Sequence, residues 1–134
     1  VVLGEEDATV VGAAMAGWRG LVNGVIENAI AAMQADSPLM AYLGPAIGPD
    51  AFEVGAEVRE AFIAHDAAAA AAFTDIGDGK YLADIYALAK QRLQAAGVNA
   101  VYGGEYCTVL QREDFFSYRR DGQTGRMVSA IWLE

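Results

Sequence analysis

The sequence has 134 residues, of which 54% are hydrophobic and 20% are charged, so it can form one packed core but is too short for two domains with separate cores. Nine Lys and Arg against eighteen Asp and Glu leave a net charge of −9 at pH 7, which argues against a protein that binds the phosphate backbone of nucleic acids. No apolar run approaches the roughly twenty residues that a membrane-spanning helix needs.

The first half of the chain predicts two strands separated by a helix. Residues 9–16 are small or β-branched with both faces apolar, which predicts a buried central strand. From Leu21 to Met33, apolar residues recur every four positions, which predicts an amphipathic helix. Residues 39–43 predict a second buried strand. The next six residues, 44–49, contain two Gly and two Pro and predict a stiff, irregular loop.

The second half continues the mixture of helices and strands. In chain order it predicts a helix over 55–65, a helix-favouring Ala run over 67–72, a turn over 75–80, a helical face from Leu82 to Leu93 that ends at Gly97, a short strand over 98–102, a polar turn over 117–125 and a long strand over 125–133. The expected fold class is therefore α+β, a single domain of mixed β-sheet with flanking helices.

A first candidate site lies between the first strand and the first helix, at Gly17, Trp18, Arg19 and Gly20. Unpaired N–H groups at the start of a helix favour anions, and Arg19 would complete a phosphate or carboxylate site. The alternative is a tight turn in which Trp18 packs in the core and Arg19 binds a core carboxylate. The spacing matches neither a Walker loop nor a dinucleotide-binding fingerprint.

A second candidate site is the basic cluster formed by Arg119, Arg120 and Arg126, next to Tyr118. Three of nine basic residues within eight positions reverse the local sign of an acidic chain. In a β-hairpin the two neighbouring arginines would face opposite ways, so one would bind a ligand while the other pairs with Asp121 or Glu113. The alternative is a solvated turn.

Cys107 and His65 are the only cysteine and the only histidine. Cys107 could act as a nucleophile if a base or cation lowered its pKa, which would require His65 to meet it in space, or it could simply be a small buried apolar residue. His65 is interpreted as a surface or helix-end residue, since one His and one Cys supply too few ligands for zinc.

One cysteine excludes an internal disulfide and fits a reducing compartment, and the first residues lack the basic start of a secretory signal, so we expect a cytoplasmic protein. Because the sequence begins on Val and its first residues already favour a strand, we also expect further residues upstream.

Seven segments together resemble the YfiH-type family, which has been called laccase-domain or polyphenol oxidase, peptidoglycan editing factor, and purine nucleoside phosphorylase with adenosine deaminase activity. They occur in order across nearly the whole chain: Ala16–Leu21, Leu43–Pro49, Phe52–Val58, Lys80–Ile85, Cys107–Thr108, Phe115–Asp121 and Thr124–Met127.

The resemblance implies one α/β domain over 1–134, similar to the deamidating toxin fold and lacking the family's N-terminal part. It also implies a zinc ion held by two His and one Cys, and adenosine, inosine or methylthioadenosine as substrates together with phosphate or water. Arg19 and Cys107 are the expected catalytic residues, and Gly17, Trp18, Arg19, Tyr118, Arg119 and Arg120 the expected substrate-binding or phosphate-binding residues.

The sequence departs from the family pattern at Met15, which replaces the first His of the family's His-Ala-Gly-Trp-Arg-Gly motif. The resemblance places the other metal-binding His and the ligand Cys upstream, in a stretch that this chain does not contain. It matches Cys107 to a downstream cysteine of the family that is not a metal ligand. A thioether is a weak zinc ligand and cannot act as a base. No intact metal site is therefore expected.

Three hypotheses follow. The first is a phosphorylase-type enzyme whose metal comes from the missing region, supplied as an N-terminal segment or by a partner. The second is an inactive fragment or degenerate homologue that keeps the fold without the metal. The third is a copper-dependent polyphenol oxidase, which Met15 supports only weakly, because a blue-copper site needs His, Cys and Met together.

Overall fold

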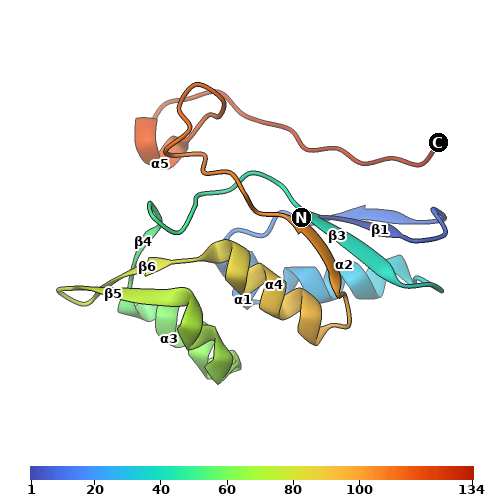
Figure 1. Ribbon diagram of the computed structural model, residues 1–134, viewed down its shortest axis with the longest axis horizontal. Coiled ribbons are helices and arrows are strands. Elements are labelled where there is room, and N and C mark those ends of the chain that lie inside the picture. Colours follow the sequence, from blue (N-terminus) through green and yellow to red (C-terminus); the bar gives the residue numbers. More distant parts are fainter. The chain divides into compact units, whose positions relative to one another are not determined.

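A computed structural model describes all residues, 1–134. Contacts within the chain form two compact units, which are taken one at a time below (Figure 1). The first unit comprises Val1–Gly44, Ala89–Gly104 and Ser129–Glu134, and the second comprises Pro45–Leu88 and Glu105–Val128. Both helices and strands are present, and the expected α+β class is confirmed.

The first unit is built on a mixed four-stranded sheet in the order β2-β1-β3-β7. Its strands are β1 (Val2–Glu5), β2 (Val11–Ala13), β3 (Leu39–Leu43) and β7 (Ala100–Gly103). β1 pairs antiparallel with both β2 and β3, whereas β3 and β7 run parallel. The strand predicted over 39–43 is confirmed with the same bounds, but it is not buried on both faces, because Met40 and Tyr42 are exposed.

The prediction of a central strand over 9–16 is wrong. Only Val11–Ala13 form a strand, and β2 lies at an edge of the sheet because β1 alone pairs with it. An apolar run shows that a segment avoids water, but it does not show how many neighbouring strands it has. The central position belongs to β1 and β3 instead.

The helix predicted from Leu21 is divided into α1 (Trp18–Val22) and α2 (Val25–Met33). Gly24 causes the division, since its φ of +93° is a left-handed conformation that cannot continue a right-handed helix. The side chain of Met33 in α2 lies against Gly12 of β2, where a Cβ would come within 2.8 Å of the Met33 sulfur. α2 therefore packs on one face of the sheet (Figure 1).

Helix α4 (Ile85–Ala95) is the longest helix, with 11 residues, and no helix has the length and apolar character needed to cross a membrane. In the first unit, Arg92 of α4 forms an ion pair with Glu27 of α2, with Nε to Oε1 at 2.8 Å. The same guanidinium donates to the carbonyl oxygen of Val22. Since α2 and α4 lie far apart in the sequence, this contact links two segments of the unit.

The second unit contains an antiparallel sheet in the order β4-β6-β5, flanked by a helix. Its elements are β4 (Glu53–Gly55), α3 (Ala56–His65), a 3-10 helix η1 (Ala67–Ala72), β5 (Phe73–Gly77) and β6 (Lys80–Ala83). The turn predicted over 75–80 is shorter in the structure: residues 78–79 connect β5 to β6, and residues 75–77 and 80 belong to the two strands. Leu82, expected on a helix, lies on β6.

The end of the chain differs most from expectation. Residues 125–133 form no strand, although their alternating pattern predicted one. Alternation marks a strand only where a neighbouring strand supplies the ladder hydrogen bonds, and no strand of the structure pairs with this segment. Just before it, α5 (Tyr118–Asp121) is a short helix in place of the expected hairpin.

Candidate functional site

The first candidate segment, 16–20, covers the end of the connection from β2 and the first residues of α1, in the first unit. Gly17 is the N-cap residue, and no side chain caps the helix. A Cβ at Gly20 would lie 3.3 Å from the carbonyl oxygen of Met15, so a glycine here lets the chain turn tightly. Met15 is 91% exposed and Trp18 is half-buried.

Arg19 does not bind a core carboxylate, which corrects the alternative considered from the sequence. Its side chain is exposed, and its guanidinium lies over the Trp18 ring, 4.7 Å from the centroid. No ion pair involves it. The donors of Arg19 are therefore available to a ligand.

Cys107 closes the irregular loop at 44–49 onto the segment that follows β7, in the second unit. Its sulfur accepts hydrogen bonds from the N–H groups of Gly48, at 3.2 Å, and Leu110, at 3.5 Å. The two stretches also form a parallel bridge between Ala46 and Cys107. His65 is exposed at the C-terminal end of α3 and is not among the sulfur's hydrogen-bond partners. These contacts give Cys107 a structural role and provide no Cys/His dyad.

Tyr86 of α4 holds the same loop and was expected only as part of a helical core face. Its buried hydroxyl accepts from the N–H of Ala46 at 2.7 Å and donates to the carbonyl oxygen of Tyr106 at 2.6 Å. A buried tyrosine hydroxyl normally needs a hydrogen-bond partner. A tyrosine on the buried face of a predicted helix could therefore have indicated a polar contact here. The sequence alone did not reveal which backbone groups would supply it.

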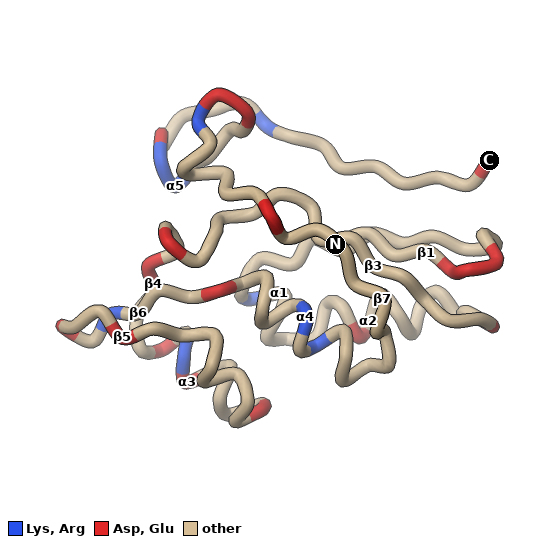
Figure 2. The backbone as a smooth tube through the Cα atoms, in the orientation of Figure 1, with Lys and Arg blue, Asp and Glu red and all other residues tan.

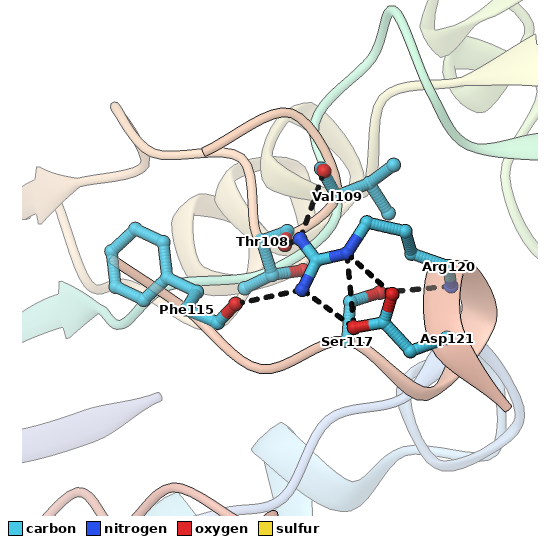
Figure 3. Close-up of polar contacts among 6 residues, drawn as sticks. All are labelled: Thr108, Val109, Phe115, Ser117, Arg120 and Asp121. Carbon is cyan, nitrogen blue, oxygen red and sulfur yellow. Dashed lines mark hydrogen bonds and ion pairs between the residues drawn. The ribbon is translucent and has the colours of Figure 1, made fainter. Parts of the chain in front are cut away.

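Arg120 is bound on every side by its own unit (Figure 3). Its Nη1 donates to the carbonyl oxygens of Thr108 and Val109, and its Nη2 donates to that of Phe115. Nε and Nη2 also bind the Asp121 carboxylate, with an ion-pair distance of 2.8 Å. All five N–H groups of the guanidinium are thus used. In this structure Arg120 holds the loop together, and all its donors have partners within the chain.

The ion pair has a matching electrostatic effect. The hydrogen bond from Arg120 lowers the pKa of Asp121 below its ordinary value, and the same bond raises the pKa of Arg120. The expectation that one arginine of the pair binds Asp121 is confirmed. One acidic residue, Asp121, lies within the basic cluster of Arg119, Arg120 and Arg126 and reduces its net charge (Figure 2).

Arg119 has the opposite character. The hydroxyl of Ser117 caps α5 by accepting from the N–H of Arg120, and Arg119 then extends toward β4. One N–H of its Nη1 donates to the carbonyl oxygen of Glu53 at 3.1 Å, and the guanidinium lies 5.4 Å from the centroid of the Phe52 ring. Its other N–H groups have no partner in the chain. Tyr118, next to it, is 77% exposed.

The second and third candidate segments, treated separately in the sequence, come together through Arg120. Its bonds to the carbonyls of Thr108 and Val109 place α5 beside the loop that carries Cys107. Arg19 belongs to the first unit, whereas Arg119 and Arg120 belong to the second. In the second unit Arg119 offers an exposed guanidinium and Tyr118 an exposed phenol. A guanidinium can bind phosphate oxygens or sugar hydroxyls through charge-assisted hydrogen bonds.

The residues present do not fit the zinc site that the resemblance implies. No group of three or more His, Cys, Asp and Glu side chains comes together in the structure. Met15 offers one exposed thioether, Cys107 points its sulfur at backbone N–H groups, and His65 is at a helix end. Zinc in proteins is held mainly by imidazole and thiolate, with three protein ligands at a catalytic site. Neither this donor set nor its arrangement provides them.

Comparison with known proteins gives consistent matches over nearly the whole chain. A family model described as multi-copper polyphenol oxidoreductase laccase matches residues 1–134. A protein of Escherichia coli named purine nucleoside phosphorylase YfiH is 61% identical over 127 residues, which cover 93% of this chain and 51% of that protein. A purine nucleoside phosphorylase of Haemophilus influenzae is 50% identical over 127 residues, covering 92% and 52% of the two chains.

Solved structures give the same result. Protein NMB0706 of Neisseria meningitidis superposes with a TM-score of 0.87 at 56% identity, over 90% of this chain and 50% of that one. A hypothetical protein YfiH of Bacillus licheniformis superposes with a TM-score of 0.78 at 27% identity, over 90% and 48%. The chain therefore spans about half the length of the relatives that it matches.

Proposed function

We propose, because this chain belongs to the YfiH-type family that the laccase model describes, that it forms part of a purine nucleoside phosphorylase. The observation that carries the proposal is the 61% identity, over 93% of this chain, to the E. coli protein of that name. At such identity a shared fold is expected throughout the matched part. The proposed activity is that of the whole protein, of which this chain would supply about half.

The proposed reaction transfers a ribosyl group. An oxygen of inorganic phosphate forms a bond to C1 of the ribose, and the glycosidic C–N bond breaks. The purine leaves with the electron pair of that bond and takes up a proton, so that inosine and phosphate give hypoxanthine and ribose 1-phosphate. The finer proposal adds adenosine and methylthioadenosine as substrates. It also adds deamination, in which water replaces the amino group of adenosine and ammonia leaves.

Arg119 is the residue of the second unit best suited to hold phosphate or ribose oxygens. Its guanidinium is anchored at one N–H by the Glu53 carbonyl and over the Phe52 ring, while its remaining donors face no protein acceptor. The exposed hydroxyl of Tyr118 can donate to the same ligand. In the first unit, Arg19 on the Trp18 ring offers a second anchored guanidinium with free donors. Either guanidinium could bind phosphate oxygens through charge-assisted hydrogen bonds.

Arg120 and Cys107 act differently in this proposal. Both hold backbone in place, Arg120 through three carbonyl oxygens and Cys107 through the N–H of Gly48. Arg120 positions α5, which carries Tyr118 and Arg119, and Cys107 positions the loop at 44–49. The family's zinc is a property that we carry over only to the whole protein, and no step is assigned to it here. We also propose a cytoplasmic location, where nucleosides and a reduced Cys107 are expected together.

A second candidate function is a degenerate homologue that keeps the fold without the metal. Met15 favours it, because a thioether stands where the resemblance expects imidazole and no cluster of metal-binding side chains surrounds it. A copper oxidase finds support only in the description of the family model, since imidazole and thiolate donors do not meet in this chain.

The test is phosphate-dependent release of hypoxanthine from inosine. This chain would be co-expressed with the half of the E. coli relative that it does not match, once with Met15 and once with Met15→His. We expect both complexes to release base only when phosphate is present, and the Met15→His complex to do so at least about tenfold faster. No base release from the Met15→His complex, or equal release without phosphate, would contradict the phosphorylase proposal. Equal turnover with Met15 would overturn the degenerate alternative.

A further inference from the structure

The four-stranded sheet of the first unit has two unequal faces. On one face, strand residues Leu3, Ala41 and Leu43 are buried, with exposed fractions of 0%, 2% and 2%. Glu5 is buried on the same face, and α2 packs there through Met33. This face is the covered one.

The other face contains no buried residue, although it is apolar. The register aligns four of its residues in one row across the sheet: Ala13, Val2, Tyr42 and Tyr102. Directly paired strand residues have their side chains on the same side of a sheet. Tyr42 and Tyr102 are 44% and 60% exposed, and Ala13 is also exposed.

A second row lies beside the first and has the same character. It consists of Val11, Gly4, Met40 and Ala100, of which Met40 is exposed and the others are half-buried. Neither row contains a charged residue. We call the face that carries both rows the open face.

An uncovered face of this kind is unusual. Antiparallel sheets that face water usually alternate apolar and polar residues, yet here both faces are apolar apart from Glu5 on the covered one. Large exposed apolar patches mark interaction surfaces.

We propose that the open face docks the half of the YfiH-type polypeptide that this chain does not match. The lengths of the relatives indicate which polypeptide would cover this face. The chain covers about half of the E. coli relative and half of the Neisseria structure, with a TM-score of 0.87 for the shared part. Each relative thus has roughly as much polypeptide again, and a sheet face without a second layer is where it can complete a core. A second copy of this chain fits less well, because each copy carries a net charge of −9.

Hydroxyl-radical footprinting tests the surface without any substitution. The chain is labelled alone and after co-expression and co-purification with the unmatched half of the E. coli relative. We expect oxidation of Met40, Tyr42 and Tyr102 to fall at least about threefold in the complex. Oxidation of Tyr118, in the second unit, is expected to change less than twofold. A complex in which the first three residues remain as reactive as before would overturn the proposal.

Charge substitution then tests the same face. Tyr42→Asp and Tyr102→Asp should each reduce the yield of co-purified half at least about tenfold, because a buried unpaired carboxylate is costly. Ile76→Asp is the control, since Ile76 is 47% exposed but lies on β5 of the other unit. With Ile76→Asp, the yield of co-purified half should stay within twofold of the wild-type yield. Circular dichroism checks that each variant is folded. Failure of the two halves to co-purify would overturn the proposal, as would a dimer of this chain that protects Tyr42 and Tyr102. These experiments measure only the association of the two halves. The proposed phosphorolysis is tested separately, by the release of base.

Discussion

Arg119 and Arg120 are neighbours in one short helix, but their surroundings give them opposite roles. Arg120 donates to three carbonyl oxygens and one carboxylate, whereas Arg119 is held at a single N–H. Sequence could predict that the pair divides its roles, because one arginine beside Asp121 was expected to pair with it. It could not predict which carbonyls the other donors would reach, since these lie in a loop up to 12 residues away.

The first prediction compares lysine substitutions at these two positions. Arg120→Lys should lower the Tm by about 5 °C or more, because three ammonium donors cannot replace a five-donor planar fork. Arg119→Lys should change the Tm by less than about 2 °C, since that side chain is exposed. Differential scanning calorimetry measures both. Equal Tm values for the two variants would contradict the structural role of Arg120.

Glu5 is a buried carboxylate that the sequence did not single out. It accepts hydrogen bonds from the Thr9 hydroxyl and from the N–H groups of Asp36, at 2.5 Å, and Ser37, at 2.6 Å. It thereby ties the β1–β2 turn to the start of β3. These bonds, that of Thr9 first, lower the pKa of Glu5 below its ordinary value of about 4.5, although burial acts in the opposite direction.

A lowered pKa in the folded state makes stability depend on pH in a definite direction. The stabilisation by ionised Glu5 is fully present above the unfolded-state pKa and is lost as the pH falls through the folded-state pKa. The difference in stability between the wild type and Glu5→Gln should be constant from pH 7 to about 5.5, then shrink below about pH 4.5. Glu6→Gln, at an exposed neighbour, is the control. Urea unfolding across this pH range gives the difference, and a gap that grows toward acid would refute the assignment.

At the scale of elements, local apolar patterns predicted where several helices and strands lie along the chain. The bounds of β3 and the approximate bounds of α3 and α4 followed from apolar spacing. The errors occur in segments whose structure depends on which strand lies beside them. β2 is an edge strand, and 125–133 lacks a partner strand, because no periodicity states which segment lies alongside.

Gly103, at the end of β7, shows how closely two of these elements approach. Its φ is +82°, and a Cβ there would lie 2.4 Å from the carbonyl oxygen of Leu43 in β3. Gly97 has a similar φ of +90° but nothing within 4 Å of its Cβ position. A side chain at Gly97 would therefore meet backbone strain only, whereas a side chain at Gly103 would meet both backbone strain and a steric clash.

Gly97→Ala should destabilise the chain by about 1–2 kcal/mol, the cost of a left-handed conformation for alanine. Gly103→Ala should cost about 1–3 kcal/mol more, because the added methyl must also push β3 and β7 apart. Urea denaturation measures both free energies of unfolding. If the two variants lose equal stability, the close approach of β3 and β7 at this position is wrong.

At the scale of the whole molecule, sequence established more about the family than about this chain's chemistry. Segments such as Ala16–Leu21 and Phe115–Asp121 identified the family, and the match over residues 1–134 agrees. The candidate site was only partly predictable, because anchoring by Phe52, Glu53 and Tyr86 depends on contacts between distant segments. The open face was not predicted at all, since it requires the strand register.

The central claim is that this chain keeps the fold of its family but has no zinc-binding donor set. The zinc content of the purified 134-residue chain, measured by mass spectrometry after loading with zinc and exhaustive dialysis, tests it most directly. We predict far less than one zinc ion per chain, and no difference between the wild type and Met15→Leu. One zinc ion per chain that survives dialysis and is lost in Met15→Leu would contradict the claim.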